Sequence, residues 1–534
     1  MSTSDETRSG RDRPPGSPGD PGGLDRRDFT KRMVAMLAAT ELGLGSVGVG
    51  RLAAQEREAP SHPRPVPRPP DEAIVGIQMS PHTMLDQGIE VCLDFIQETA
   101  ALNMVMPYTH AFHTSTLGKP LEQLATDHPT PPRDFRGRVP AVWVRHHEEY
   151  FRDTALRIRA PDPALEFADR NLFAEMVGPC RDRGIKVYGR VLEAGGQHIE
   201  GFDTVRTVNV YGDRGRHGCW SHPDYRNLWS AVVADMFSHY ELDGFQWGAE
   251  RMGPLMNVIL PWNDDPPTCF CEHCIARGEA ADIDAGRARE GYTRLYEYVR
   301  GLVDGERPPP EGVFTVFLRH LIRYPEILSW EYQYRLSREA VQAGMYRAAK
   351  AIRPEADIGW HVDHQPSSWD LVYRAQMSYE EMGAHSDFIK LILYHAVLGG
   401  RIHSWYLQRF QNTILKELTL DQSLALYYAL FGYDPAQEPA VENLRTQGFS
   451  PDYVHRETRR SVASANGATR IYSGIGFDVP GSPPEDPEAI YQAVLNSFDA
   501  GAGGIVVSRE YEENRAPNLR AVGRAVREMG VGAG

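Results

Sequence analysis

The chain has 534 residues, 41% of them hydrophobic and 24% charged, a composition typical of a globular protein that excludes a fibre or a largely disordered chain. The formal net charge is −15 at pH 7 and no basic stripe stands out. Because phosphate binding requires concentrated lysine and arginine, this balance argues against a nucleic-acid partner. The length allows either two to four average domains or a single barrel with long insertions.

The N-terminal residues differ in composition from the rest of the chain. Gly- and Pro-rich sequence leads to Asp25-Arg26-Arg27-Asp28-Phe29-Thr30-Lys31 and then to a weakly apolar run that is too short and polar to span a membrane. This order resembles a twin-arginine signal, which implies the twin-arginine export machinery as a partner and a periplasmic or extracellular location. A disordered tail that contains an arginine pair is the alternative. We predict a signal region at 1–55, a Pro-rich linker at 56–70 and a folded domain at 71–534.

Eight short apolar runs follow in the folded part, and helical patterns separate them. The runs are Ile74–Ile77, Met104–Tyr108, Lys186–Val191, Gly244–Trp247, Ile358–Val362, Phe388–Leu393, Arg470–Ile475 and Gly504–Val507. Strands that alternate with helices in this way are typical of parallel sheets with crossover helices. Eight such units predict a (β/α)8 TIM barrel, an α/β fold. Two connections, Ala111–Asp169 after the second strand and Arg251–Ala356 after the fourth, are long enough to wall a cleft.

Acidic and aromatic side chains follow several of the predicted strands. In a barrel of this kind the active site lies at the C-terminal ends of the strands, so these residues are the candidates for chemistry. Two carboxylates on either side of a glycosidic bond can divide the work of hydrolysis, one as proton donor and the other as nucleophile or base. We predict Glu250 as acid/base, Asp478 as nucleophile or base and Glu510 as the reserve nucleophile. The predicted substrate-binding residues are Glu193, Trp247, Arg251, Trp360, His361, Asp363, Lys390, Tyr394 and Arg509.

Four cysteines occur on either side of the segment that contains Glu250. They are Cys219, in Arg216-His217-Gly218-Cys219, and the three of Cys269-Phe270-Cys271-Glu272-His273-Cys274. Four thiolates at this spacing suit a closed tetrahedral zinc site, which contributes to folding and has no open position for chemistry. Disulfides and free thiols are the alternatives. Folding before export favours zinc, because the metal is then loaded in a reducing compartment.

The order of these residues carries a family resemblance. Arg-His-x-Cys, then Pro223-Asp224-Tyr225-Arg226, an acid after a strand and Cys-Phe-Cys-x-x-Cys resembles the zinc-bearing segment of family 42 glycoside hydrolases, the β-galactosidases. The resemblance covers about 215–274 and implies that the four cysteines bind structural zinc and that Glu250 is the acid/base. Two residues depart from the family pattern: Ala249 replaces the asparagine that precedes the acid/base, and Asp478 stands where the family has a glutamate.

Three hypotheses of function follow. The first is an exported glycoside hydrolase that acts on an oligo- or polysaccharide. The second is a barrel lyase or isomerase with a catalytic metal held by His361, Asp363, His364 and Glu193, since histidine and carboxylate together can bind an ion with open positions. The third is a carbohydrate-binding barrel without catalytic activity, because a fold does not guarantee a function. The sequence does not indicate an oligomeric state.

Overall fold

The structure is a computed structural model that describes residues 72–531, except 114–115, 194, 262–264, 365–369 and 483–484. The predicted signal region and linker, 1–55 and 56–70, lie outside the described residues. None of the helices in the described part combines the length and the apolar character that crossing a membrane requires.

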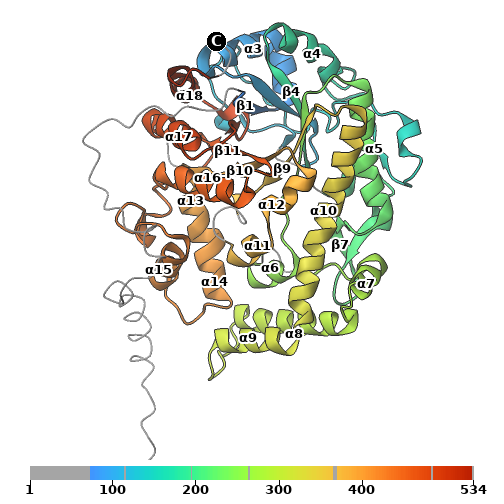
Figure 1. The fold of residues 1–534 in the computed structure, drawn as a ribbon, viewed down its shortest axis with the longest axis vertical. Coiled ribbons are helices and arrows are strands. Elements are labelled where there is room, and N and C mark those ends of the chain that lie inside the picture. Colours follow the sequence, from blue (N-terminus) through green and yellow to red (C-terminus); the bar gives the residue numbers. More distant parts are fainter. Residues whose placement is uncertain are drawn as a thin grey trace, which may run out of the picture. The chain divides into compact units, whose positions relative to one another are not determined.

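Eight parallel strands close into a barrel in the order β1-β12-β11-β10-β9-β8-β4-β2 (Figure 1). They are β1 (Ile74–Met79), β2 (Met104–His110), β4 (Lys186–Glu193), β8 (Gly244–Ala249), β9 (Asp357–Val362), β10 (Phe388–Ile392), β11 (Arg470–Gly476) and β12 (Gly504–Ser508). Each of them coincides with a predicted apolar run. The (β/α)8 prediction is therefore confirmed.

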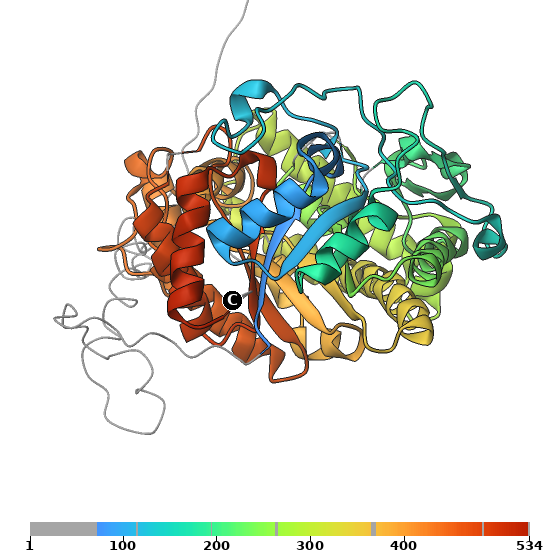
Figure 2. The same cartoon turned by 90° about the horizontal axis from the view of Figure 1, so that it is seen from above.

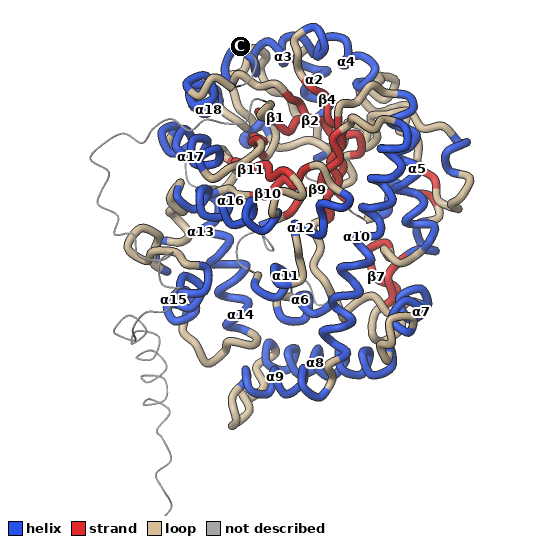
Figure 3. The backbone as a smooth tube through the Cα atoms, in the orientation of Figure 1, coloured by secondary structure: helices blue, strands red, loops and turns tan. Residues whose placement is uncertain are grey.

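Helices form a shell around these strands (Figure 3). The main ones are α3 (Ile89–Ala100), α4 (Leu172–Asp182), α5 (Pro223–His239), α10 (Glu326–Ile352), α16 (Asp452–Ala465), α17 (Pro487–Asp499) and α18 (Ala516–Glu528). Each presents an apolar stripe to the sheet; in α3, Cys92, Leu93 and Ile96 are buried at helical spacing. The first and last strands pair, with Ile74 opposite Gly504, and α3 lies beside α18, so the barrel closes between the two ends of this unit (Figure 2).

Alternation along the strands decides which side chains enter the barrel. Successive side chains of a strand point to opposite faces, so one set faces the interior and the other faces the helices. Tyr188, Phe388 and Tyr472 belong to a separate apolar cluster that fills one end of the interior. The strands are buried on both faces, as expected when helices cover a closed sheet.

Long connections follow four of the barrel strands, β2, β4, β8 and β10, and not only the two that were predicted. The loop after β2 contains η2 (Leu121–Gln123), η3 (Glu148–Phe151) and β3 (Arg157–Ile158), and the loop after β4 contains η4 (Gly196–His198), β5 (Ile199–Glu200), η5 (Phe202–Val205), β6 (Arg206–Val208) and β7 (Arg214–Gly218). After β8 come α6 (Pro254–Ile259), α7 (Glu272–Glu279), α8 (Ala285–Val303) and α9 (Val313–Arg323). After β10 come α13 (His395–Arg401), the π-helix η8 (Ile402–Leu407), α14 (Gln408–Asn412), α15 (Leu420–Phe431) and η9 (Val441–Asn443). Shorter elements are α2 (Pro81–Gln87), α11 (Leu371–Ala375), α12 (Tyr379–Met382), η7 (Gly383–His385) and η10 (Tyr511–Glu513).

The two predicted insertions are present, but β6, β7, α13 and η8 also supply residues to the site. The loops after β4 and β10 were therefore not among the predicted walls of the cleft.

Candidate active site

A cavity of about 610 Å³ lies at the C-terminal ends of the barrel strands. Strand-end residues form its floor, and the loops after β4, β8 and β10 form its walls. The predicted residues that line it are Glu250, Arg251, His361, Asp363, Tyr394, Arg509 and Glu510. Clefts of this size at this end of a barrel are the usual place for a small-molecule or carbohydrate site.

Glu250 directly follows β8, and 41% of its side chain is exposed in the cavity. Its Oε1 lies 3.0 Å from Nε2 of His361, which is buried on β9. Burial raises the pKa of the Glu250 carboxyl, but the hydrogen bond and charge of His361 outweigh burial and lower the pKa to about 2. Burial lowers the pKa of His361 to about 4. At neutral pH, a neutral imidazole therefore donates its Nε2–H to an ionised carboxylate.

Glu510 follows β12 and is held by two donors, one from β2 and one from β4. Its Oε1 accepts from the hydroxyl of Tyr108, at 3.1 Å, and from Nη1 of Arg190, at 3.0 Å. The Arg190 guanidinium also lies 4.2 Å from the centre of the Tyr108 ring. The carboxyl is almost fully buried, and its other oxygen, Oε2, has no hydrogen-bond partner among the described residues. Glu510 is thus held through one oxygen, while its second oxygen is buried and makes no hydrogen bond to the described residues.

Glu250 and Glu510 come from different strand ends and line the same cavity. Both carboxylates act electrostatically on the same buried amine, that of Lys390 on β10. Burial lowers the pKa of Lys390 well below its ordinary value, although the charges of both glutamates raise it. Lys390 is fully buried and donates to the Tyr394 hydroxyl at 3.4 Å. Lys390 does not line the cavity, whereas its partner Tyr394 does.

Asp478 does not line the cavity, although it follows β11 as the prediction requires. Its backbone takes a left-handed conformation, with φ 53°, and this turn directs the side chain toward the start of α18. There Oδ2 accepts from the backbone N–H of Arg515 and from Nδ2 of Asn518, both at 2.8 Å. The geometry gives Asp478 the role of a helix-capping group and does not support its expected role as nucleophile or base.

Two predicted aromatic contacts, Trp247 and Trp360, lie on the helix-facing side of the sheet. Both are fully buried, and they are paired in register on β8 and β9. Trp247 packs against the ring of Trp229, and the indole N–H of Trp360 donates to the carbonyl of His385. Both are core residues, so their predicted contact with substrate is not supported. Trp405 of η8 lines the cavity together with Tyr108, Tyr334 and Tyr394, and it was not among the predicted substrate contacts.

Glu193 and Arg251 form a buried ion pair in which Arg251 lines the cavity and Glu193 does not. Nη2 of Arg251 lies 3.0 Å from Oε1 of Glu193, and the same nitrogen donates to the carbonyl of Gly218 at 2.9 Å. Trp220 and Tyr225 also donate to Glu193. This group ties the ends of β4 and β8 to the residue before Cys219. Glu193 is therefore a structural support and not a group that faces a substrate.

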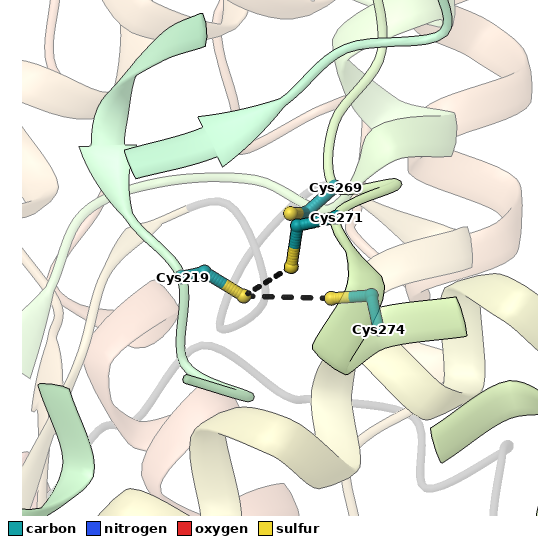
Figure 4. Close-up of side chains that lie close together, drawn as sticks. All are labelled: Cys219, Cys269, Cys271 and Cys274. Atoms are coloured by element: carbon teal, nitrogen blue, oxygen red, sulfur yellow. Dashed lines mark hydrogen bonds between the residues drawn. The ribbon is translucent and has the colours of Figure 1, made fainter. Parts of the chain in front are cut away.

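The four cysteines converge beside this support (Figure 4). Sγ of Cys219 lies 3.4 Å from Sγ of Cys274 and 3.5 Å from Sγ of Cys271, and all four sulfur atoms lie within 4.8 Å of one another. Four thiolates at about 2.3 Å from a tetrahedral zinc ion would be about 3.8 Å apart, whereas a disulfide bond is about 2.05 Å long. The backbone N–H of Val208 points to Sγ of Cys269 at 3.4 Å, as a donor to a thiolate would. The donor set and its spacing therefore fit a metal ion better than disulfides.

The ligand set of the metal-lyase hypothesis does not assemble. Glu193 forms an ion pair with Arg251, and His361 forms a hydrogen bond with Glu250. His364 contacts Arg401 at Nδ1 and the backbone N–H of Tyr394 at Nε2. Among the described residues, His361, Asp363, His364 and Glu193 are not one of the groups whose ligand atoms converge on a common point. The geometry gives this hypothesis no support.

Comparisons with known proteins give similar architectures at low identity. No protein-family model matches the chain, and no curated protein matches it significantly. The glycoside hydrolase domain of PgaB (BpsB) from Bordetella bronchiseptica is similar over 86% of this chain and 99% of that one, with a TM-score of 0.45 and 11% identity.

Two β-galactosidases are also similar. The similarity to the enzyme from the haloarchaeon Halorubrum lacusprofundi covers 86% of this chain and 58% of that one, with a TM-score of 0.47 and 12% identity. The similarity to the enzyme from Marinomonas ef1 covers 86% of this chain and 61% of that one, with a TM-score of 0.45 and 11% identity. The chain thus spans about three fifths of the length of these two relatives. At these scores the similarities carry no functional argument, so the activity has to be inferred from the site itself.

Proposed function

We propose that this protein is a glycoside hydrolase whose carboxylate pair is Glu250 and Glu510. The observation that carries the proposal is the convergence of these two carboxylates, from β8 and β12, in one open cavity at the C-terminal face of the barrel. Glycoside hydrolysis needs two carboxyl groups on either side of the scissile bond, and little else from the protein by way of reacting groups. Asp478 is replaced by Glu510 in this pair because only Glu510 lines the cavity.

Glu510 is the nucleophile or base of the proposed reaction. Tyr108 and Arg190 hold its Oε1, so the side chain is oriented by one hydrogen bond from a hydroxyl and by one ion pair with a guanidinium. Its Oε2, free of hydrogen bonds to described residues, is then the atom that attacks the anomeric carbon or takes the proton of the attacking water. Either step requires a carboxylate that is held in a fixed position.

Glu250 is the proton donor, and His361 controls whether it holds a proton. In the ligand-free site His361 keeps the carboxyl ionised, which is the opposite of what a donor needs. Burial acts in the other direction and raises the pKa of Glu250. A sugar that enters the cavity and separates Glu250 from His361 would therefore raise the pKa of Glu250 and favour its protonated form. The proton then goes to the leaving oxygen as the glycosidic C–O bond breaks, and water completes the hydrolysis.

The test uses Glu250→Gln and Glu510→Gln, with Glu98→Gln, at an exposed position on α3, as a matched control. On aryl glycosides cleaved by the wild type, each active-site variant should lose a factor of about 10² to 10⁴ in kcat. If Glu510 is the nucleophile, azide should restore release of the aryl leaving group in Glu510→Gly, with glycosyl azide as the product. Full activity in Glu250→Gln or in Glu510→Gln would contradict the proposal. Sugar binding without turnover in the wild type would favour the carbohydrate-binding hypothesis instead.

We also propose that Cys219, Cys269, Cys271 and Cys274 bind a structural zinc ion, as the family 42 resemblance implies. The sulfur spacing and the N–H of Val208 support this. The expected content is one zinc per chain, measured by elemental analysis of the purified protein. Cys271→Ser should lower both the zinc content and the melting temperature, whereas Cys92→Ser, in a buried cysteine outside the group, should leave the zinc content unchanged. A full zinc complement in Cys271→Ser would contradict the assignment.

Export remains a proposal that rests on residues 1–55 alone. A fusion of these residues to a reporter that is active only after folded export should reach the periplasm, and replacement of Arg26 and Arg27 by lysine should retain the reporter in the cytoplasm.

A further inference from the structure

The cavity wall is rich in arginine although the chain as a whole is acidic. The arginines that line the cavity are Arg190, Arg214, Arg216, Arg251, Arg401 and Arg509, against the acids Glu250, Asp265, Asp363 and Glu510. The lining thus has six arginines and four acidic residues, so its formal charge is positive, whereas the net charge of the chain is −15. A cavity that concentrates the charge opposite to that of its protein attracts ligands of the other sign.

Four of the six arginines are neutralised by carboxylates of the protein. The pairs are Arg190 with Glu510 at 3.0 Å, Arg216 with Asp265 at 2.6 Å, Arg251 with Glu193 at 3.0 Å and Arg509 with Glu513 at 2.8 Å. Arg214 and Arg401 are different. Arg214, on the exposed β7, donates to the backbone carbonyl of Asp203 at 2.7 Å. Neither has a carboxylate within ion-pair distance among the described residues.

Arg401 is the more informative of the two because it is partly buried. It ends α13, contacts Nδ1 of His364 at 2.8 Å, and its guanidinium lies 4.8 Å from the ring of Trp405 and 5.6 Å from that of Tyr394. Burial lowers the pKa of Arg401, although the charges of Tyr394 and Glu250 raise it from longer range. Removing a guanidinium from water costs free energy unless an anion pairs with it, and two neighbouring rings do not supply that anion.

The chemistry of this group indicates what the anion is. A guanidinium presents a planar fork of N–H donors that matches the two oxygens of a carboxylate or of a sulfate ester. Trp405 and Tyr394 stand beside the fork at the wall of the same cavity as Glu250. An aromatic ring next to a bidentate donor can hold a sugar ring by its apolar face and its anionic substituent by the fork.

We propose that Arg401 binds an anionic substituent of the sugar, so that the substrate class is acidic carbohydrate: an oligosaccharide that carries uronate carboxylates or sulfate esters. This inference rests on the proposed function for the statement that the ligand is a carbohydrate. Arg214 extends the positive wall toward the rim, where a second acidic unit of a longer chain would lie.

The experiment measures binding separately from turnover. Isothermal titration of the Glu250→Gln variant is performed with three tetrasaccharides of matched length: an oligouronate, a sulfated oligosaccharide and a neutral one. At least one of the two anionic ligands should bind about tenfold tighter than the neutral ligand or more, as expected for a charge-assisted contact, and the preferred one identifies the anionic group. Added on that background, Arg401→Met should abolish the preference while leaving neutral binding within about twofold.

Two further variants keep the result interpretable. Arg401→Lys retains the charge but not the fork and should keep only part of the preference, even if Arg401→Met fails to fold. Arg294→Met, in an exposed ion pair on α8, is the matched control and should change nothing. Equal binding of neutral and anionic ligands, or an undiminished preference in Arg401→Met, would overturn the inference. Anionic binding that depends on Arg401 in a wild type without hydrolase activity would leave the inference standing and overturn the proposed function.

Discussion

Four carboxylates at the ends of barrel strands differ in where their side chains point. Glu250 and Glu510 enter the cavity, whereas Glu193 and Asp478 turn away from it and hold loops in place. Their positions in the sequence look alike. The difference lies in the direction of the backbone at each position and in the donors that each carboxylate meets.

Glu193 shows the effect of alternation. Arg190 and Leu192 of the same strand line the cavity, so the next residue, Glu193, faces the opposite side, where Tyr225 of α5 and Arg251 meet it. Asp478 shows the effect of a turn, because its left-handed backbone breaks the alternation. A carboxylate at a strand end is therefore a candidate for catalysis only when alternation and the following turn both direct it inward.

The largest expected effect on stability comes from removing Glu193. Glu193→Ala leaves the buried guanidinium of Arg251 without its carboxylate, and the loss of one partner of a buried pair costs about 3–5 kcal/mol of unfolding free energy. Urea denaturation followed by circular dichroism measures it. Glu250→Gln, whose carboxylate is partly exposed, should change the same quantity by less than about 1 kcal/mol. Similar losses in the two variants would remove the distinction between support and active-site acids.

A smaller effect is expected at Asp478. Asp478→Ala removes the acceptor for the N–H of Arg515 and for Asn518 at the start of α18, and the loss of such a cap costs about 0.5–2 kcal/mol. Because Asp478 does not line the cavity, kcat per folded molecule should stay within about threefold of the wild type, in contrast to the loss predicted for Glu510. Kinetics at a temperature where both proteins are fully folded separates the two quantities. A loss of more than about a hundredfold in Asp478→Ala would restore it as a catalytic candidate.

The barrel could be predicted from the sequence because each strand is a buried apolar run and each helix has a periodic apolar stripe. The cysteines could be grouped because their spacing is local and chemically specific. Trp247 and Trp360 were predicted as substrate contacts because both lie near strand ends. That prediction did not consider which of the two faces of the sheet each side chain points to. On β9, Gly359 and His361 share the inward face, so Trp360 between them must face the helices.

Other parts of the site lie beyond what one sequence can indicate. Arg401 and Trp405 come from the end of α13 and from a π-helix that leave β10, and no motif distinguishes them from other helical residues. The contacts of Tyr108 and Arg190 with Glu510 join residues more than 300 positions apart along the chain. Such contacts depend on the closure of the barrel and on the packing of long loops, which have no local signature.

The finest test of the comparison concerns the pH dependence of activity. His361 lowers the pKa of Glu250 against the effect of burial, so a variant without the donor, His361→Leu, should raise the pKa of Glu250. A proton donor works only when protonated, so the basic limb of the kcat/KM profile should move to higher pH, by about one unit or more. His361→Gln keeps an N–H at a similar reach and is the matched control. An aryl glycoside whose leaving group needs no proton should show no such movement in any variant. A basic limb that stays in place in His361→Leu, or that moves to lower pH, would mean that His361 does not set the protonation of Glu250 and that this carboxylate is not the proton donor.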